Sequence, residues 1–351
     1  MPDVKRAWIV LTFTLSFLLF VPASMAQTLQ QMAVYQGADR QQLLVEEAKK
    51  EGSLVFYTTI PSDLVGQLVE PFEKKYGIKV VVWRTRDDLV LQRVIMESRS
   101  DKHMVDVINI PTVSLEALRR ENLLQEIRSP YQKDLLPSVV PAHHEWASIS
   151  VSVRVQAYNT NAIRKEDLPK NYHDLLSPKW KGKLGIEANS HEWVSSVIKD
   201  MGQTEGVKFF SDLAGNGLST RSGYPLLTKL VATGDVPMAL TVLPHSVEEQ
   251  KKLGAPIDWF VIKEPAIGTP GGVAVPKKVP HPYAALLFYD FMISPEGQSL
   301  IVKIGYIPTN QKVESPFKNL KFKLLDPTVM LDEEEKSFNQ FRQLILDRGQ
   351  R

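Results

Sequence analysis

The chain has 351 residues, with 42 Lys and Arg against 40 Asp and Glu, and it contains no cysteine. The nearly neutral balance argues against a large nucleic-acid surface, and the missing cysteine excludes disulfides, a lipid-anchoring cysteine and a cysteine nucleophile. The length is ample for two domains, each held together by its own hydrophobic core.

Residues 1–26 have the features of a secretory signal. Lys5 and Arg6 form a basic n-region. Residues 7–21 form an apolar run that is shorter than a typical membrane-spanning helix. Small residues lead up to Ala26. We therefore expect cleavage after Ala26 and a mature chain in the periplasm. The alternative interpretation is an uncleaved membrane anchor.

Strands and helices alternate in the first third of the mature chain. The predicted helices are 39–50, 62–76, 87–99 and 112–121, and the predicted strands are 54–57, 78–83 and 105–110. Ser62 is expected to be the N-cap of the second helix. This alternation indicates an α/β fold with a mostly parallel, doubly wound sheet.

Polar side chains follow three of these strands. The residues concerned are Thr58, Thr59, Arg84 and Asn109. In open α/β sheets, ligands bind beyond the carboxyl ends of the strands. Hydroxyl groups and helix N-termini favour a polar or anionic ligand, and arginine suits bidentate binding of carboxylate or phosphate. An ordinary strand-to-helix turn explains the two threonines equally well.

The rest of the chain carries motifs in a specific order. Residues 149–159 alternate apolar and polar side chains, and residues 268–310 combine a glycine-flanked strand, an apolar helix and a second helix that Ser294 caps. The motifs are Arg154-Val155-Gln156-Ala157-Tyr158-Asn159, Pro178-Lys179-Trp180-Lys181-Gly182, Ala285-Leu-Leu-Phe288-Tyr-Asp-Phe291-Met-Ile-Ser294-Pro-Glu296-Gly297-Gln298 and Gly305-Tyr306-Ile307-Pro308. This succession resembles that of periplasmic solute-binding proteins of ABC importers, in particular the ferric-iron-binding type (extracellular solute-binding protein family 1).

The resemblance implies an α/β fold of two lobes, the type II periplasmic binding protein fold. Each lobe is then a mostly parallel sheet flanked by helices, and crossing hinge strands join the two. Lobe one is expected at residues 27–152 plus 272–310, and lobe two at residues 153–271 plus 311–351. The implied function is to capture a small solute in the interlobe cleft and deliver it to an ABC permease. We expect a monomer with no cofactor and no nucleic-acid partner.

The resemblance also implies that polar residues of the second lobe and its junction face the ligand. These candidates are Arg154, Asn189, Ser190, His191, Arg221, Tyr224 and His245. With the candidates of lobe one, they would clamp a small anion or an anionic complex between arginines and helix N-termini. Closure would bend the crossing strands near Val153 and Gly271-Gly272. A helix first turn with a capping Asn or Ser explains His191 and Glu192 nearly as well.

Ferric-iron binding is the alternative function that the resemblance suggests. Iron-binding members use a histidine, a glutamate and two adjacent tyrosines, because Fe³⁺ prefers anionic oxygen ligands. The corresponding positions here fall near Pro61, Pro111, Pro244 and His245, and Leu243-Pro244-His245 replaces the tyrosine pair. We therefore expect no direct metal site, although binding of a chelated iron complex stays open.

A secreted hydrolase is an alternative of a different class. His143-His144-Glu145 and His191-Glu192 are short clusters, but neither has the H-E-x-x-H spacing, and no G-x-S-x-G elbow is present. We therefore expect no enzyme. A secreted adaptor without a small ligand is disfavoured, because hinge strands are useful mainly when something closes them.

Overall fold

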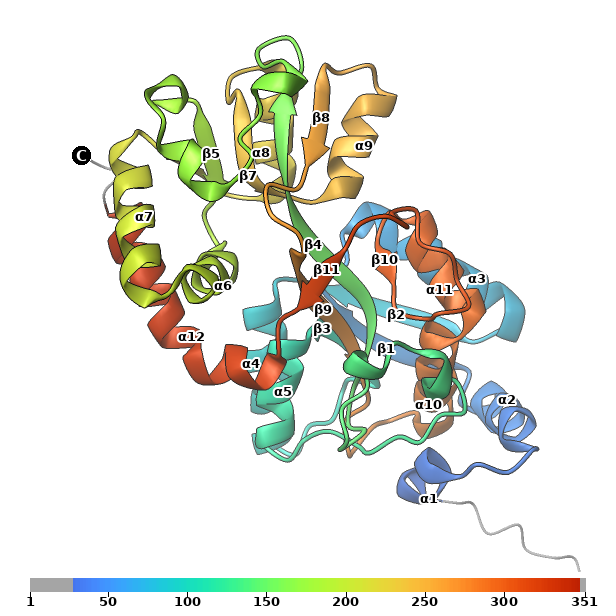
Figure 1. The fold of residues 1–351 in the computed structure, drawn as a ribbon. Helices are drawn as coiled ribbons and strands as arrows, with labels where there is room; N and C mark the ends of the chain where they lie inside the picture. Colours follow the sequence, from blue (N-terminus) through green and yellow to red (C-terminus); the bar gives the residue numbers. More distant parts are fainter. Residues whose placement is uncertain (1–27, 348–351) are drawn as a thin grey trace, which may run out of the picture.

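The computed structural model describes residues 28–347, so the predicted signal lies outside the described residues. The chain forms two lobes, and strands β4 and β9 pass from one to the other (Figure 1). The strands are β1 (Ser53–Thr58), β2 (Lys79–Arg84), β3 (Val107–Pro111), β4 (Ala147–Asn159), β5 (Leu184–Glu187), β6 (Ser219–Arg221), β7 (Met238–Val242), β8 (Ile257–Phe260), β9 (Ala266–Ala274), β10 (Ile307–Pro308) and β11 (Phe322–Leu324). The α-helices are α1 (Leu29–Val34), α2 (Arg40–Glu51), α3 (Ser62–Tyr76), α4 (Asp87–Arg99), α5 (Thr112–Arg120), α6 (His191–Met201), α7 (Gln203–Gly215), α8 (Tyr224–Thr233), α9 (Pro244–Lys252), α10 (Pro282–Ile293), α11 (Pro295–Lys303) and α12 (Pro327–Phe341).

The strand order confirms the expected architecture. The central path runs β2-β1-β3-β9-β4-β7-β5-β6, so the two crossing strands lie between the strands of lobe one and those of lobe two. The outer pairs β1–β2, β1–β3, β5–β6 and β5–β7 are parallel, whereas the crossing strands pair antiparallel with each other and with β3 and β7. The carboxyl ends of the parallel strands therefore meet at the junction of the lobes.

Most predicted elements in the first lobe are confirmed, but one cap is wrong. Helix α4 has the predicted bounds, and α3 ends before Gly77, whose φ of +73° suits glycine. Ser62 was expected to cap α3, yet Pro61 occupies the cap position and no side chain makes a cap hydrogen bond. Ser294 does cap α11, since its hydroxyl accepts a hydrogen bond from the backbone N–H of Gly297 at 3.2 Å.

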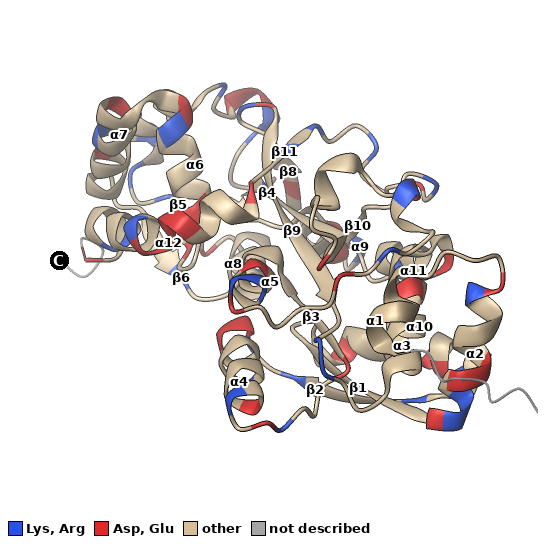
Figure 2. Cartoon of the chain, turned by 90° about the horizontal axis from the view of Figure 1, so that it is seen from below, with Lys and Arg blue, Asp and Glu red and all other residues tan. Residues whose placement is uncertain are grey.

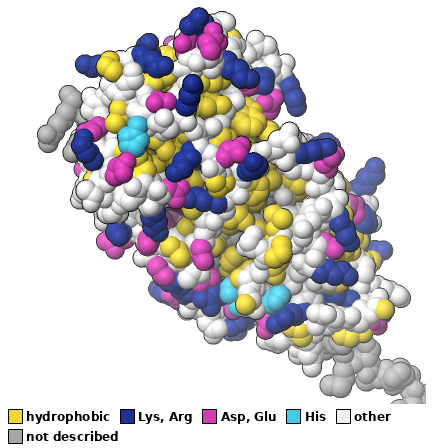
Figure 3. Space-filling view, viewed as in Figure 1, with side chains coloured by type: hydrophobic (Ala, Val, Ile, Leu, Met, Phe, Trp, Pro, Cys, Tyr) yellow, Lys and Arg dark blue, Asp and Glu magenta, His cyan; other side chains and the backbone are white. Residues whose placement is uncertain are grey.

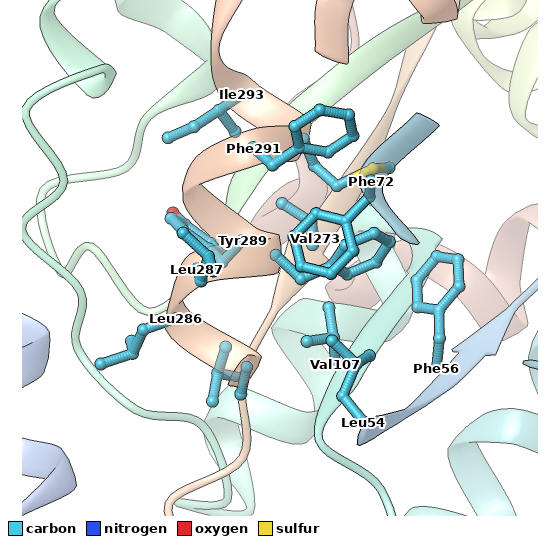
Figure 4. Close-up of a cluster of buried hydrophobic side chains, with 14 of the residues drawn as sticks. Leu54, Phe56, Phe72, Val107, Val273, Leu286, Leu287, Tyr289, Phe291 and Ile293 are labelled. Carbon is cyan, nitrogen blue, oxygen red and sulfur yellow. The ribbon is translucent and has the colours of Figure 1, made fainter. Parts of the chain in front are cut away.

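The core of lobe one is built around α10, which is more deeply buried than its sequence period suggests. The period predicts one buried face, but every residue from 284 to 293 is buried. Figure 4 shows side chains of α10 packed against those of β1, α3, β3 and β9. The Phe288 ring lies 5.1 Å from that of Phe56 and 4.8 Å from that of Phe72, at edge-to-face angles. Packing on all sides turns α10 into the central element of this lobe.

Lobe two has hydrophobic clusters on both faces of its strands. One cluster joins α6 and α7 to β5 and β7, with Trp193 and Phe210 at 6.0 Å between ring centroids. The other joins α8 and α9 to β4 and β7. The C-terminal residues Phe341, Leu344 and Ile345 are buried in the first of these clusters. The end of the described chain therefore packs into lobe two, while Arg120 of α5 binds α12 through Asp332 at 2.6 Å.

Glycines let the crossing strands approach their neighbours closely. A Cβ atom on Gly272 would lie 2.7 Å from Leu115 Cδ1 and 2.9 Å from Thr112 Cγ2, and one on Gly271 would lie 2.9 Å from Ser150 Oγ. Neither residue has a positive φ. The sequence suggests backbone freedom at these positions, but in the structure their role is tight packing of β9 onto α5 and β4.

Positive and negative side chains are mixed over the surface in Figures 2 and 3, with no large region of one charge. Acidic and basic residues occur together along helices such as α4 and α7 (Figure 2), and they are interspersed over both lobes on the face shown in Figure 3. Within residues 28–347, none of the helices combines the length and the apolar character needed to cross a bilayer.

Candidate functional site

A cleft lies between the lobes at the carboxyl ends of the parallel strands. Its wide part has a volume of about 1440 Å³, and a smaller part of about 160 Å³ lies over the crossing strands. Ile304 and Tyr306 line both parts. Of the predicted site residues, those that line the cleft are Thr59, Arg84, Asn109, Arg154, Tyr224 and His245. The structure thus brings residues from both lobes to one cavity.

Arg154 lies at the floor of this cleft, on the part of β4 that crosses between the lobes. Its Nε donates to the Tyr224 hydroxyl at 3.1 Å, and its Nη1 donates to Thr269 Oγ1 at 2.7 Å and to the backbone carbonyl of Ser152 at 2.8 Å. Its Nη2 lies 3.8 Å from Glu192 Oε2, too far for a hydrogen bond. The guanidinium is held in place on one side, and Nη2 can still donate to a ligand.

Tyr224 begins helix α8 and lies beside Arg154. The guanidinium carbon of Arg154 is 5.2 Å from the centre of the Tyr224 ring. Burial raises the pKa of the Tyr224 hydroxyl, and the positive charge of Arg154 opposes that rise. The phenol is therefore neutral at pH 7, and it can donate to an anionic ligand while it accepts from Arg154.

In lobe one, two of the predicted residues connect strands by side-chain hydrogen bonds, and two line the cleft without such a role. The buried Thr58 donates its hydroxyl proton to Asn109 Oδ1 at 2.9 Å, and Asn109 Nδ2 donates to the backbone carbonyl of Gly272 at 2.7 Å. These two side chains tie β1 to β3 and β9. Thr59 lines the narrow part of the cleft, and Arg84 is exposed in the wide part. Arg84 and Lys303 are basic side chains of lobe one that line this wide part.

In lobe two, Asn189 and Ser190 hydrogen-bond within the protein. The backbone N–H of Asn189 donates to Glu187 Oε2 at 2.7 Å, and the Ser190 hydroxyl donates to Thr241 Oγ1 at 2.9 Å. Neither residue lines the cavities of the cleft. Ser190 occupies the N-cap position of α6, but no side chain makes a cap hydrogen bond there. Both residues therefore make hydrogen bonds within lobe two and do not line the cleft.

Two other predicted residues also lie outside the cleft. Arg221 ends the edge strand β6, and its Nη1 donates to the carbonyl of the adjacent Thr220 at 2.7 Å. His191 lies in a groove of about 250 Å³ between α6 and α12, where its Nε2 is 4.0 Å from Glu334 Oε1. Sequence position alone placed both near a ligand, but the direction of each side chain depends on the packing of the lobe.

His245 and Tyr306 meet in the cleft, one from each lobe. Their ring centroids are 5.0 Å apart. Burial lowers the pKa of His245 to about 4, so the imidazole is neutral at pH 7. Tyr306 belongs to the Gly305-Tyr306-Ile307-Pro308 turn, which pairs with β4 through β10. The contact joins the start of α9 to lobe one.

The positions expected for iron ligands do face the cleft. Pro61 and His245 line its wide part, and Pro111 lines its narrow part. Among residues 28–347, no group of three or more His, Cys, Asp or Glu side chains is arranged to hold a metal ion. The tyrosines Tyr224 and Tyr306 line the same cavity.

The sequence analysis missed several cleft residues. These are Ser150, Ser152, Thr269 and Tyr306. The two serines share one face of β4 with Arg154, and the alternation along residues 149–159 could have identified them, because side chains two apart on a strand point the same way. Thr269 carries no such signal, since it reaches Arg154 only through the pairing of β9 with β4.

Comparison with known proteins gives consistent matches. The family described as bacterial extracellular solute-binding protein matches residues 104–327. Iron uptake protein A1 of Synechocystis sp. is 25% identical over 276 residues, which cover 71% of this chain and 75% of that protein.

Solved structures agree with this match. The iron-bound HitA of Pseudomonas aeruginosa has a TM-score of 0.74 and 25% identity, covering 83% of this chain and 99% of that one. The fold is also shared with AfuA of Actinobacillus pleuropneumoniae, with fructose-6-phosphate bound, at a TM-score of 0.70, 23% identity and coverage of 84% and 99%.

Proposed function

Because the chain belongs to the bacterial extracellular solute-binding protein family, we propose that it captures a small anionic solute, or an anionic complex, in the cleft between its lobes and delivers it to an ABC permease. The proposal includes export to the periplasm with cleavage after Ala26, a monomeric state and no cofactor. Two of the three lobe boundaries proposed from the sequence fall within β4 and β9, the strands that cross between the lobes, and the third follows β10.

The observation that carries the anionic character is the position of Arg154. Its guanidinium is fixed at the cleft floor by Tyr224 and Thr269, and its Nη2 is not in hydrogen-bonding distance of Glu192. Charge-assisted hydrogen bonds to arginine are among the stronger polar contacts in proteins. Arg84 supplies a second positive charge from lobe one.

A ligand that binds both lobes favours the closed state, because only that state makes both sets of contacts. Arg154 and Tyr224 are held together, whereas Arg84 projects from the opposite lobe. Rotation of the lobes about β4 and β9 would bring Arg84 toward a ligand on Arg154. This closure is of the hinge type that two-lobe binding proteins use.

We infer that the chain is not an enzyme. The His143-His144-Glu145 cluster lies in lobe one, where His143 Nε2 is 3.7 Å from Glu116 of α5, and none of these residues lines the cleft. The relatives are named for iron uptake and iron binding and not for a reaction.

Ferric iron is the second candidate ligand. The names of the relatives favour it, as do the two tyrosines that line one cavity, because phenolate oxygen is a ligand that Fe³⁺ accepts. The replaced ligand positions at Pro61, Pro111 and Pro244 argue against a direct site. We expect no visible tyrosinate-to-iron band with ferric citrate, and a strong band that is lost in Tyr224→Phe or Tyr306→Phe would establish iron as the ligand.

A thermal-shift screen tests the proposed function. The mature protein is heated with ferric salts, phosphonates, small carboxylates, polyamines and thiamine at matched ionic strength. A ligand at 100 times its Kd stabilises the folded state by about 2.7 kcal/mol. We expect an anion to raise the Tm of the wild type and to have a reduced effect on Arg154→Ala. Stabilisation by neutral or cationic solutes alone would contradict the anionic ligand.

A further inference from the structure

Glu187 is a buried carboxylate at the carboxyl end of β5, directly below the second-lobe side of the cleft. Only 1% of its surface is exposed. Strand β5 pairs with β6 so that Glu187 lies opposite Arg221, and the loops after these two strands lead into α6 and α8. Glu187 therefore lies where two helix starts meet, the kind of place where an anion is favoured in an α/β fold.

The Glu187 carboxylate accepts three hydrogen bonds from these loops. Its Oε2 accepts from the backbone N–H of Asn189 at 2.7 Å. Its Oε1 accepts from the backbone N–H of Gly223 at 3.0 Å and from Asn189 Nδ2 at 3.3 Å. Within residues 28–347, no Lys, Arg or His lies in ion-pair distance of this carboxylate, so N–H groups are its nearest positive partners.

These hydrogen bonds also fix the residues that face the ligand. Gly223 immediately precedes Tyr224, and Tyr224 accepts the hydrogen bond from Arg154. Burial raises the pKa of Tyr224 and lowers that of Arg154, whereas the negative charge of Glu187 raises the pKa of both groups. Glu187 is therefore close enough to influence the ligand-facing pair without lining the cleft.

We propose that Glu187 is a built-in anion that positions Tyr224 and Arg154 and determines the ligand specificity of lobe two. It occupies the backbone N–H groups that would otherwise hold an anionic ligand. A ligand's anionic group then reaches lobe two through the Arg154 and Tyr224 side chains. Because the Glu187 charge opposes further negative charge nearby, a singly charged group such as a carboxylate is favoured over a phosphate dianion. This consequence for the ligand rests on the proposed function.

Chemical rescue tests the built-in anion. The substitution Glu187→Ala removes the equivalent of one acetate ion and leaves the N–H groups of Asn189 and Gly223 facing the vacated space. We expect 100 mM sodium acetate at pH 7, relative to 100 mM sodium chloride, to raise the Tm of Glu187→Ala by roughly 3–6 °C more than it raises that of the wild type. The same gain from chloride and acetate would overturn the proposal.

Glu192→Ala is the matched control. Glu192 is the other second-lobe carboxylate beside Arg154, but no backbone N–H of the described residues hydrogen-bonds to it. Its removal lowers the negative charge without freeing N–H donors, so acetate should not rescue this variant. Equal stabilisation of both variants by acetate would mean that the effect depends on net charge only, and the proposal would fail.

A second variant tests the proposal where Glu187→Ala is too unstable to measure. If Glu187→Ala does not fold, Glu187→Gln preserves the volume with one oxygen acceptor. Hydrogen exchange at Asn189 or Gly223 should then be at least about tenfold faster than in the wild type, and unchanged exchange at both would refute the role of the carboxylate.

Inorganic phosphate is the probe for specificity. It should stabilise Glu187→Ala, or Glu187→Gln if only that variant folds, more than the wild type. A wild type that binds phosphate as well as either variant would refute the specificity role. If the wild type binds no anion but acetate rescues Glu187→Ala, the proposed function fails and the built-in anion stands.

Discussion

Each lobe contains buried carboxylates, and Asp290 of lobe one and Glu187 of lobe two are stabilised by different means. In lobe one, Asp290 of α10 accepts hydrogen bonds from Arg40 of α2, at 3.1 Å from Nε and 3.5 Å from Nη2. In lobe two, Glu187 accepts from backbone N–H groups and an asparagine side chain. Arg40 is fully engaged, because its Nη1 also donates to the carbonyls of Met32 and Tyr35.

The difference follows from where each carboxylate lies. Asp290 lies away from the cleft, and its partner Arg40 holds α1, α2 and α10 together. Glu187 lies beside the cleft, where backbone donors stabilise it and leave the Nη2 group of Arg154 available to a ligand. The Arg40–Asp290 ion pair thus contributes to the stability of lobe one, and we propose that the backbone-held charge of Glu187 contributes to recognition in lobe two.

The largest effect is expected from breaking the ion pair of lobe one. Arg40→Ala leaves the Asp290 carboxylate buried without its cation, so it should lower the free energy of unfolding by about 3–5 kcal/mol. Urea denaturation measures the change. The matched control is Arg86→Ala, which breaks the exposed Arg86–Asp88 pair and should change the free energy of unfolding far less than Arg40→Ala does. Equal losses in both variants would contradict the difference between buried and exposed pairs.

A second effect is expected from pH, through His245 in the contact between the lobes. Burial lowers the pKa of His245 from 6.5 to about 4, so the unfolded chain binds the proton more readily than the folded chain. Stability should therefore fall as the pH drops from about 6.5 to about 4, by up to about 3 kcal/mol.

Denaturation of the wild type and of His245→Phe over this pH range isolates the histidine. The phenyl ring keeps an aromatic contact with Tyr306 and cannot be protonated, so the variant should lose less stability on acidification. Parallel pH profiles for the two proteins would show that His245 does not contribute.

A third effect concerns ligand binding. Arg154→Ala should weaken binding of the anion found in the screen by roughly ten- to a hundredfold, since a hydrogen bond to a charged group contributes about 1.5–3 kcal/mol. Arg221→Ala is the control, because Arg221 lies on the edge strand outside the cleft and the affinity should not change. Calorimetry measures the affinity of the wild type, Arg154→Ala and Arg221→Ala for the anion. A larger loss of affinity in Arg221→Ala than in Arg154→Ala would place the site elsewhere.

The smallest effect is expected at the surface. Lys208 and Asp212 form an exposed pair one turn apart on α7. Asp212→Ala should change the free energy of unfolding by only about 0.3–0.5 kcal/mol. Urea denaturation at low and high salt measures this change. A loss of stability above about 1 kcal/mol that persists in high salt would contradict the interpretation of Lys208–Asp212 as a solvent-screened surface pair.

The sequence alone determined the order of elements in each lobe. Hydrophobic period and glycine stops located α4 and the end of α3, because burial of one face and the backbone freedom of glycine are local properties. The succession of motifs identified the two-lobe fold. Arg154 was also found this way, since it opens one of these motifs and lies on the crossing strand β4.

Only the tertiary structure decided which polar residues face a ligand. Asn189, Ser190 and Arg221 follow or end strands of lobe two as expected, but their hydrogen bonds go to other parts of the protein. Glu187 is a single glutamate at the end of a short strand, and nothing in its neighbours along the chain marks it as an anion held by two loops. Those loops come together because β5 and β6 pair side by side, and pairing between distant segments is a property of the whole fold.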